Sequence, residues 1–299
     1  MTASAPFALG LAALLAAPFA ATPPAPARSG FETEALGRIA RLEQRASAHP
    51  GDAAVRVDLA MEYRSLSRLS GRADWDAKAA AAVAAALAVS PADPQALTVK
   101  AWVQAANHDF EGAVVTAAAA ADAAPASPWA WGVLADALTE LGRYPEAVAA
   151  VEKMMARRPG AAAYSRAAHL RSLHGDSEGA IALMKMAVDA TSPSDHEQRA
   201  WMLVMLGREH QVVGEHDAAR RLYRGALLAV PGYHLATYHL ADSLAATGQV
   251  EEALALLEPL HTANPMATTA AALGDLNRQI AATGPQRISV VRIQSSKGL

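Results

Sequence analysis

Six prolines recur along this chain at almost constant intervals, and this spacing constrains its fold more than any other feature. The intervals are 34, 34, 34, 38 and 34 residues. Proline lacks an N–H and clashes with the preceding turn, so it stops a helix from continuing. A period of this length is typical of helical hairpins that stack on their neighbours. The prolines are Pro91, Pro125, Pro159, Pro193, Pro231 and Pro265.

Glycine and alanine share this period. We expect a glycine where the first helix of a hairpin ends, because glycine takes a positive φ without a Cβ penalty. An aromatic residue two positions later, such as Tyr144, then begins the second helix. We expect alanine where the paired helices cross, because a methyl side chain allows close approach. These positions are Gly142, Gly175, Gly214 and Gly248, and Ala113, Ala147, Ala180, Ala219 and Ala253.

The clearest copy of the repeat reads Trp131-x2-Leu134-Ala135-x2-Leu138, then Gly142-x-Tyr144-x2-Ala147, then Pro159. This pattern resembles the tetratricopeptide repeat, and the resemblance covers about residues 52 to 267. A second good copy runs from Leu203 to Pro231, with His210 in place of the usual tyrosine. The resemblance implies an all-α fold, a right-handed α-solenoid of about six helix-turn-helix repeats with terminal capping helices.

The predicted units are residues 53–92, 94–127, 128–160, 161–199, 200–233 and 234–267. Two of them are irregular. The first carries an insertion at Gly71 to Ala77, whose Trp75 either contacts the surface or closes over the hairpin. The interval of 38 places extra residues at Thr191 to Glu197, where we expect a bend or an exposed loop.

The two ends differ from the repeats. Residues 1–30 hold an uncharged apolar run at 7–21, typical of a signal peptide, and a linker rich in alanine and proline. Residues 31–50 are predicted to form an N-terminal capping helix, residues 51–284 the solenoid, and residues 285–299 a frayed tail or a short β-prone arm. No Lys or Arg precedes Arg28, so a misassigned start or an alanine-rich arm is the alternative to secretion. The expected location is therefore secreted or periplasmic, with cytoplasmic as the alternative.

Catalytic and ligand-binding patterns are weak. The segment Gly175 to Gly179 fits G-x-S-x-G, but that nucleophile motif needs a strand before its serine, and here a turn between helices is expected. The ten histidines lack a zinc-binding spacing, and the chain has no cysteine. A net charge of −3 gives no footprint for nucleic acid. We expect no enzyme activity, no metal and no cofactor.

The run from Ala79 to Val89 is too short to cross a membrane and is expected to be a core helix, so no span remains once the signal is removed. In the family that the chain resembles, the first helices line a concave groove, and large aromatics beside charges suit a peptide. The resemblance implies groove positions at Met61, Arg64, Thr98, Trp102, Trp129, Asp136, Glu140, His169, Arg208, Gln211, Tyr238 and Asp242. Trp102 and Trp129 either face this groove or fill the space between helices.

The hypothesis that follows is a non-catalytic scaffold that binds a protein or peptide partner in this groove, in the bacterial cell envelope. The alternative is a regulatory or assembly subunit of a dedicated enzyme complex. The asparagines Asn107, Asn264 and Asn277 lie outside the groove, which argues against binding of chaperone tails. Neither the identity of the partner nor the oligomeric state follows from the pattern.

Overall fold

The computed structural model describes residues 30–72 and 74–283, and this part of the chain is helical, with no strand. The predicted signal peptide and linker, except Gly30, and the predicted C-terminal tail lie outside the described residues, and Gly30 begins α1. The helices are α1 (Gly30–Ala48), α2 (Ala53–Ser70), α3 (Asp74–Val89), α4 (Pro94–Ala106), α5 (Phe110–Ala123), α6 (Pro128–Glu140), α7 (Tyr144–Arg157), α8 (Ala161–Leu173), α9 (Ser177–Asp189), α10 (His196–Val212), α11 (His216–Ala229), α12 (His234–Ala246), α13 (Val250–Ala263) and α14 (Ala267–Thr283).

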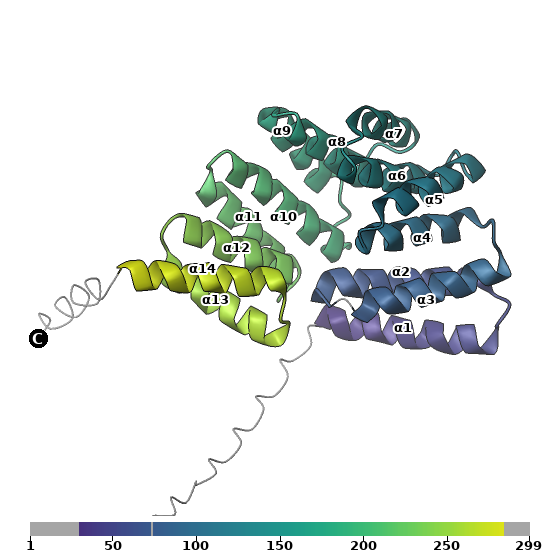
Figure 1. The fold of residues 1–299 in the computed structure, drawn as a ribbon, viewed down its shortest axis with the longest axis horizontal. Helices are drawn as coiled ribbons and strands as arrows, with labels where there is room; N and C mark the ends of the chain where they lie inside the picture. The colour runs from purple at the N-terminus through teal and green to yellow at the C-terminus, as the bar shows by residue number, and fades with distance from the viewer. Residues whose placement is uncertain (1–29, 73, 284–299) are drawn as a thin grey trace, which may run out of the picture.

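These helices pair into six hairpins, from α2 with α3 to α12 with α13, and the predicted α-solenoid is confirmed. Helix α1 packs on α2 at one end of the array, and α14 packs on α13 at the other. Figure 1 shows the hairpins following one another in an arc, with α6, α8 and α10 nearer its middle than α7 and α9. We call α2, α4, α6, α8, α10 and α12 the first helices.

The turns inside the hairpins follow the glycine period. Gly142, Gly175, Gly214 and Gly248 have φ values of 71°, 80°, 81° and 80°, in the left-handed region that a side chain disfavours. In the second hairpin His108, with φ 61°, takes the same position. Each turn residue lies two positions after the end of its first helix, so the glycines fix where the helices end.

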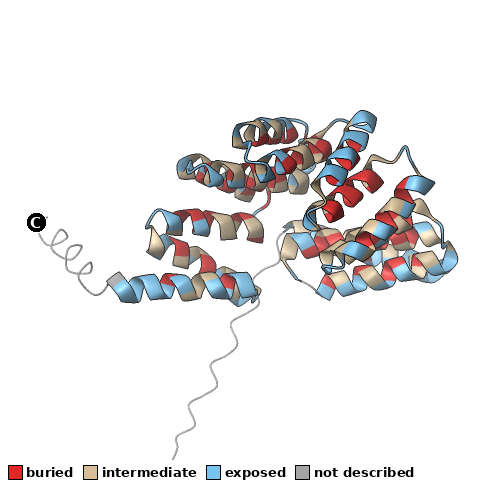
Figure 2. Ribbon diagram, turned by 45° about the horizontal axis from the view of Figure 1, so that its top comes forward, coloured by how far each residue is buried: buried red, intermediate tan, exposed pale blue. Residues whose placement is uncertain are grey.

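The core lies between the helices rather than at one centre (Figure 2). Alanines at the predicted crossing positions Ala113, Ala147, Ala180, Ala219 and Ala253 are all 0% exposed. Trp131 is also buried, and its Nε1 donates to the Pro125 carbonyl at 3.0 Å, which satisfies the indole N–H. Small residues at the crossings therefore bring the paired helices together, as the repeat pattern predicts.

The insertion predicted between the first two paired helices is shorter than expected. Helix α3 already begins at Asp74, so Trp75 lies in its first turn and not in a loop. Trp75 is 8% exposed and stacks on Tyr63, with ring centroids 5.9 Å apart. Asp74 and Asp76 sit in the first turn, where negative charge is stabilised by the helix dipole. The prediction for 71–77 as an inserted loop is therefore wrong for residues 74–77.

The interval of 38 residues also has a different structure from the one expected. The connection after Asp189 ends at Asp195, whose side chain accepts from the Gln198 N–H and begins α10 at His196. Helix α10 has 17 residues, four more than α8 and α12, which have 13 each. The extra residues extend a helix by one turn instead of forming a loop through Glu197.

The arc closes on itself. Figure 1 shows α12 to α14 beside the end of α2, although these segments lie far apart in the sequence. The Asn264 side chain donates to the Ser70 carbonyl at 3.0 Å, and Phe31 of α1 packs against the cluster that contains Tyr233 and Leu257. The first and last hairpins are therefore neighbours. Within residues 30–72 and 74–283, no helix is long and apolar enough to span a membrane.

Candidate partner-binding groove

One position recurs on every first helix, six residues before the positive-φ turn residue. We call these residues the inner row. The first three members are partly covered and the last three are exposed, so exposure is greater toward the C-terminal units. Five of the six are polar or charged, so a partner that followed the row would contact side chains of different charge in successive units. The inner row is Ser65, Trp102, Asp136, His169, Arg208 and Asp242.

At the N-terminal end of the inner row, arginines of α2 cluster around Trp102, and Trp102 contacts Trp129. The Arg64 guanidinium lies 4.8 Å from the Trp102 ring centroid, and that of Arg68 lies 5.6 Å away. Trp102 meets Trp129 of α6 edge to face at 6.1 Å. Both tryptophans are partly exposed, so they fill space between helices and still present ring surface. Arginine over a tryptophan face is a favourable cation–π arrangement.

Two of the predicted groove residues are unavailable to a partner. Thr98 is 2% exposed, and its hydroxyl donates to the Pro94 carbonyl at 2.7 Å. Arg64 is 8% exposed and forms an ion pair with Asp76 of α3. The positions of α8 and α10 equivalent to Thr98, Ser165 and Val204, are also buried. In α4, α8 and α10 this helical position faces a neighbouring helix rather than the open side, which is why the assignment of Thr98 fails.

The middle of the row joins α6 to α8. Arg166 of α8 pairs with Asp136 through two hydrogen bonds of 2.6 and 2.8 Å, and also donates to the Gly132 carbonyl at 3.2 Å. This bidentate geometry fixes the carboxylate between the two helices. Glu140 and His169 beside it are exposed. The pair with Arg166 did not appear in the sequence-based groove, because the period of 34 does not indicate which charges meet across units.

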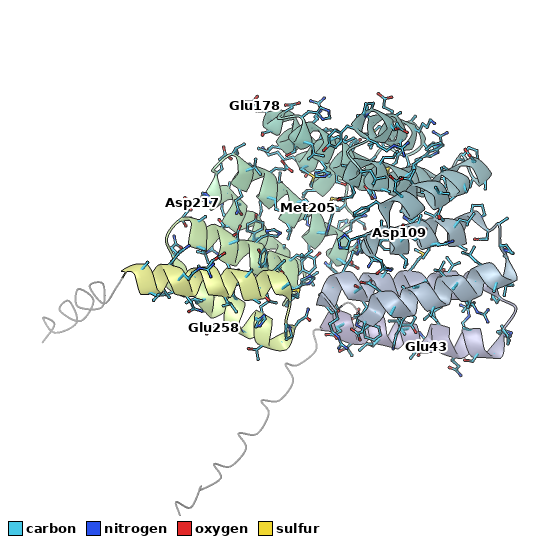
Figure 3. The ribbon with its side chains drawn as sticks, viewed as in Figure 1. Glu43, Asp109, Glu178, Met205, Asp217 and Glu258 are labelled. Carbon is cyan, nitrogen blue, oxygen red and sulfur yellow. The ribbon has the colours of Figure 1, made fainter. Side chains whose placement is uncertain are left out.

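At the far end, Arg208 and Asp242 extend the row onto α10 and α12. Gln211 donates to Asp242 at 2.6 Å and accepts from the buried Tyr223 hydroxyl at 2.9 Å. Arg208 is exposed and has a weak contact with the Met205 sulfur at 3.8 Å. In Figure 3 Met205 lies toward the middle of the arc, whereas Asp217 and Glu258 lie at its periphery. Arg208 is therefore an exposed cation next to Met205.

Two partly buried rings of α12, those of His239 and Tyr238, lie near this end of the row. Burial, together with the smaller effect of the nearby Arg208 charge, lowers the pKa of His239 to about 4. Burial raises the pKa of Tyr238, with the Asp242 and Asp275 charges acting in the same direction. Met61, the remaining predicted groove residue, is half-buried and packs against the core cluster that contains Tyr63 and Trp75. Among the predicted groove residues, Glu140, His169, Arg208 and Asp242 are exposed.

The G-x-S-x-G segment forms the predicted turn between two helices. Gly175 has a positive φ, and the Asp176 carboxylate accepts from the Gly179 N–H at 2.9 Å, which caps α9. Ser177 is the first residue of α9 and follows helix α8, not a strand. The strained strand-to-helix elbow that activates such a serine is therefore absent at this segment.

Comparisons with known proteins agree with this fold. Residues 104–170 and residues 204–265 match two family models, both described as tetratricopeptide repeat. No curated protein matches the sequence. The crystal structure of the APC/C hetero-tetramer Cut9-Hcn1 is similar, with a TM-score of 0.63 and 14% identity over 82% of this chain and 46% of that chain. This chain therefore spans less than half the length of that relative.

A thermophilic tetratricopeptide protein of Thermus thermophilus, TTC0263, has a TM-score of 0.57 and 19% identity over 65% of this chain and 100% of that chain. A tetratricopeptide repeat protein from Parabacteroides merdae has a TM-score of 0.50 and 16% identity over 75% and 86% of the two chains. At these identities the likeness concerns the fold. The two family models show that residues 104–170 and 204–265 are tetratricopeptide repeats, and the six hairpins continue the same α-solenoid along the described part of the chain.

Proposed function

We propose that this chain is a non-catalytic scaffold that holds a segment of a partner protein along the inner row. Tetratricopeptide repeats are protein–protein interaction modules, and solenoids of this kind use their concave surface for binding. The observation that carries the proposal is the run of exposed polar side chains His169, Arg208 and Asp242 at one equivalent position of successive first helices.

The residues of this stretch suit an extended segment better than a single small ligand. His169 lies on α8, Arg208 on α10 and Asp242 on α12, so the three side chains are spread over three units. A partner that contacts all three must extend across those units. Because the signs of charge alternate between Arg208 and Asp242, the ionic groups would determine the register of the segment.

The test is affinity capture from cell fractions with the full chain and with the double variant His169→Ala and Arg208→Ala. We expect capture of the partner to weaken by about tenfold or more, since each lost hydrogen bond to a charged group costs about 1.5–3 kcal/mol. Circular dichroism should show unchanged helical content, because both side chains are exposed.

A matched control replaces Lys185 and Arg221, which are exposed on the second helices α9 and α11. This control should capture the partner as the unsubstituted chain does. Equal capture by all three proteins would show that the inner row is not the binding surface. A stoichiometric enzyme among the captured proteins would instead favour a regulatory or assembly subunit.

We also propose that the protein acts in the bacterial cell envelope. The support is the uncharged apolar run at residues 7–21, with the small residues Ala17, Ala20 and Ala21 where a signal peptidase would cleave. Expression of the full chain followed by fractionation should place it outside the cytoplasm. N-terminal sequencing should then begin near residue 22. An intact Met1 in the cytoplasmic fraction would contradict this location.

A further inference from the structure

Two of the first helices are longer than the others. Helices α4, α6, α8 and α12 have 13 residues each, whereas α2 has 18 and α10 has 17. Helix α2 starts three residues after Pro50, as α4 starts three residues after Pro91, so its surplus lies at its C-terminal end. Helix α10 ends two residues before Gly214, in step with the other units, so its surplus lies at its N-terminal end.

These two surplus segments meet across the arc, and we call their contact the clasp. Glu197 of α10 accepts from the Ser65 hydroxyl at 2.6 Å and from the Arg68 guanidinium at 2.5 Å. His196 beside it contacts Phe31 of α1 edge to face at 5.6 Å. The four-residue excess in the proline spacing is therefore the turn of helix that reaches the first unit.

The clasp continues onto α12 and α13. The His234 ring Nδ1 lies 3.2 Å from the Leu69 carbonyl, and the Asn264 side chain donates to the Ser70 carbonyl. Gly71 has φ 70°, and a Cβ built on it would lie 2.8 Å from the Asn264 amide nitrogen and 3.0 Å from the His234 ring. A side chain at position 71 would strain the turn and would also clash with Asn264 and His234. The close contact between the turn at Gly71 and residues His234 and Asn264 therefore requires a glycine at position 71.

Glu197 sits at the arginine–tryptophan end of the inner row. Its partner Arg68 lies over Trp102, and its partner Ser65 is the first member of the row. Three other arginines nearby have acidic partners within their own region, since Arg64 pairs with Asp76, Arg38 with Glu62 and Arg72 with Asp74. Arg68, which is 40% exposed, instead pairs across the clasp with Glu197. A carboxylate that arrived from elsewhere could make the same contacts.

We propose that the clasp is an autoinhibitory contact, in which Glu197 occupies a carboxylate site that Ser65 and Arg68 form beside Trp102. An acidic segment of the partner binds this site when Glu197 leaves it. The proposal rests on the scaffold function and adds the chemistry of the partner and its regulation. Glu197 itself indicates the occupant, because it shows which group the site accepts. Trp102 and Trp129 would then contact apolar atoms next to the acidic group.

The exchange is energetically accessible. The ion pair between Arg68 and Glu197 is partly exposed, at 40% and 21% of the two side chains, and pairs of this kind are weak. A partner with several carboxylates would compete with Glu197 for Ser65 and Arg68. Its additional contacts can offset the free energy lost when the pair between Arg68 and Glu197 breaks. The hydrogen bonds of His234 and Asn264 restrict opening in the absence of such a partner.

A fluorescein-labelled hexaglutamate peptide tests the site by anisotropy, at constant ionic strength, on the full chain. We expect Glu197→Gln to tighten peptide binding about fivefold, because the competing carboxylate is gone. The control Glu178→Gln removes the same charge from an exposed position on α9 (Figure 3). Adding Arg68→Gln to Glu197→Gln should abolish the gain. Equal binding by the Glu197 and Glu178 variants would overturn the proposal.

Opening is measured separately by pulsed dipolar spectroscopy. The chain has no cysteine, so Gln44→Cys and Glu258→Cys place two spin labels on α1, next to the first hairpin, and on α13 of the last hairpin. Glu197→Gln and, independently, Gly71→Ala should broaden the distance distribution toward longer values, and Gly71→Ala should also tighten peptide binding. A distribution that opens without any gain in peptide binding would overturn the autoinhibitory role.

The two proposals fail in different ways. The capture assay compares the His169 and Arg208 double variant with the second-helix control and does not involve Glu197. If that variant still loses capture while Glu197→Gln gains no peptide affinity, the clasp is a structural contact only and the scaffold stands. If Glu197→Gln gains peptide affinity while the double variant captures normally, the scaffold row is wrong and the carboxylate site stands.

Discussion

Replacing Tyr223 with alanine should lower the free energy of unfolding by about 3–5 kcal/mol, the cost of removing a large buried aromatic side chain. Tyr223 is 0% exposed on α11. Its ring stacks on His239 with centroids 5.8 Å apart, and a Cβ built on Gly207 of α10 would lie 2.4 Å from its Cε1 atom. The side chain therefore joins three helices. Urea unfolding followed by circular dichroism measures the loss.

The matched control is Tyr223→Phe. It keeps the ring and removes only the hydroxyl, which donates to Gln211 at 2.9 Å, so we expect a loss of about 1 kcal/mol. A comparable loss for both variants would mean that the hydrogen bond, and not the packing of the ring, dominates. A loss below about 1 kcal/mol for the alanine variant would contradict the burial of Tyr223 between α10 and α12.

Acidification should destabilise the C-terminal hairpins through His239. Burial lowers the pKa of this imidazole to about 4 in the folded chain, whereas an unfolded chain has a histidine pKa of about 6.5. Between these values the unfolded chain binds more protons, so stability rises with pH across that window. The contribution is complete above about pH 6.5 and is lost as the pH falls toward 4, a total of about 3 kcal/mol.

Urea midpoints at several pH values between about 7 and 4.5 measure this loss, and His239→Gln should reduce the slope. Some slope should remain, because burial also lowers the pKa of His234. Arg208→Gln should raise the pKa of His239, since the Arg208 charge disfavours the imidazolium. A titration by nuclear magnetic resonance that gave His239 an ordinary pKa would show that its ring is not held in a buried environment.

The hairpins could be predicted from the sequence because single residues determine where they turn. Gly142, Gly175, Gly214 and Gly248 all have the positive φ expected, and the crossing alanines are fully buried. The lengths of helices were harder to predict. Extra residues between two prolines can form a loop or lengthen a helix, and the spacing alone does not distinguish them. Asp195 and Asp74 favour the helix by stabilising its first turn.

The candidate groove was predicted only in part. Positions taken from the resemblance place Trp102, Asp136, His169, Arg208 and Asp242 on one row, because the period preserves equivalent positions of the first helices. That these residues bind a partner stays a prediction. The period carries no information about pairs across units, so the bond between Arg166 and Asp136 was missed. Contacts across the arc, such as Arg68 with Glu197, depend on the curvature of the whole array.

A linear array of repeats can fray from either end, because each unit touches only its neighbours. In this chain the hydrogen bond between Ser70 and Asn264 joins residues 194 positions apart. Loss of the last hairpin would therefore also expose the end of α2, so the first and last hairpins should exchange amide hydrogens at coupled rates. Contacts of such long sequence separation also form late, which favours slow folding. The repeat units fold locally, but the contact between the first and last hairpins should make the unfolding of the array more cooperative.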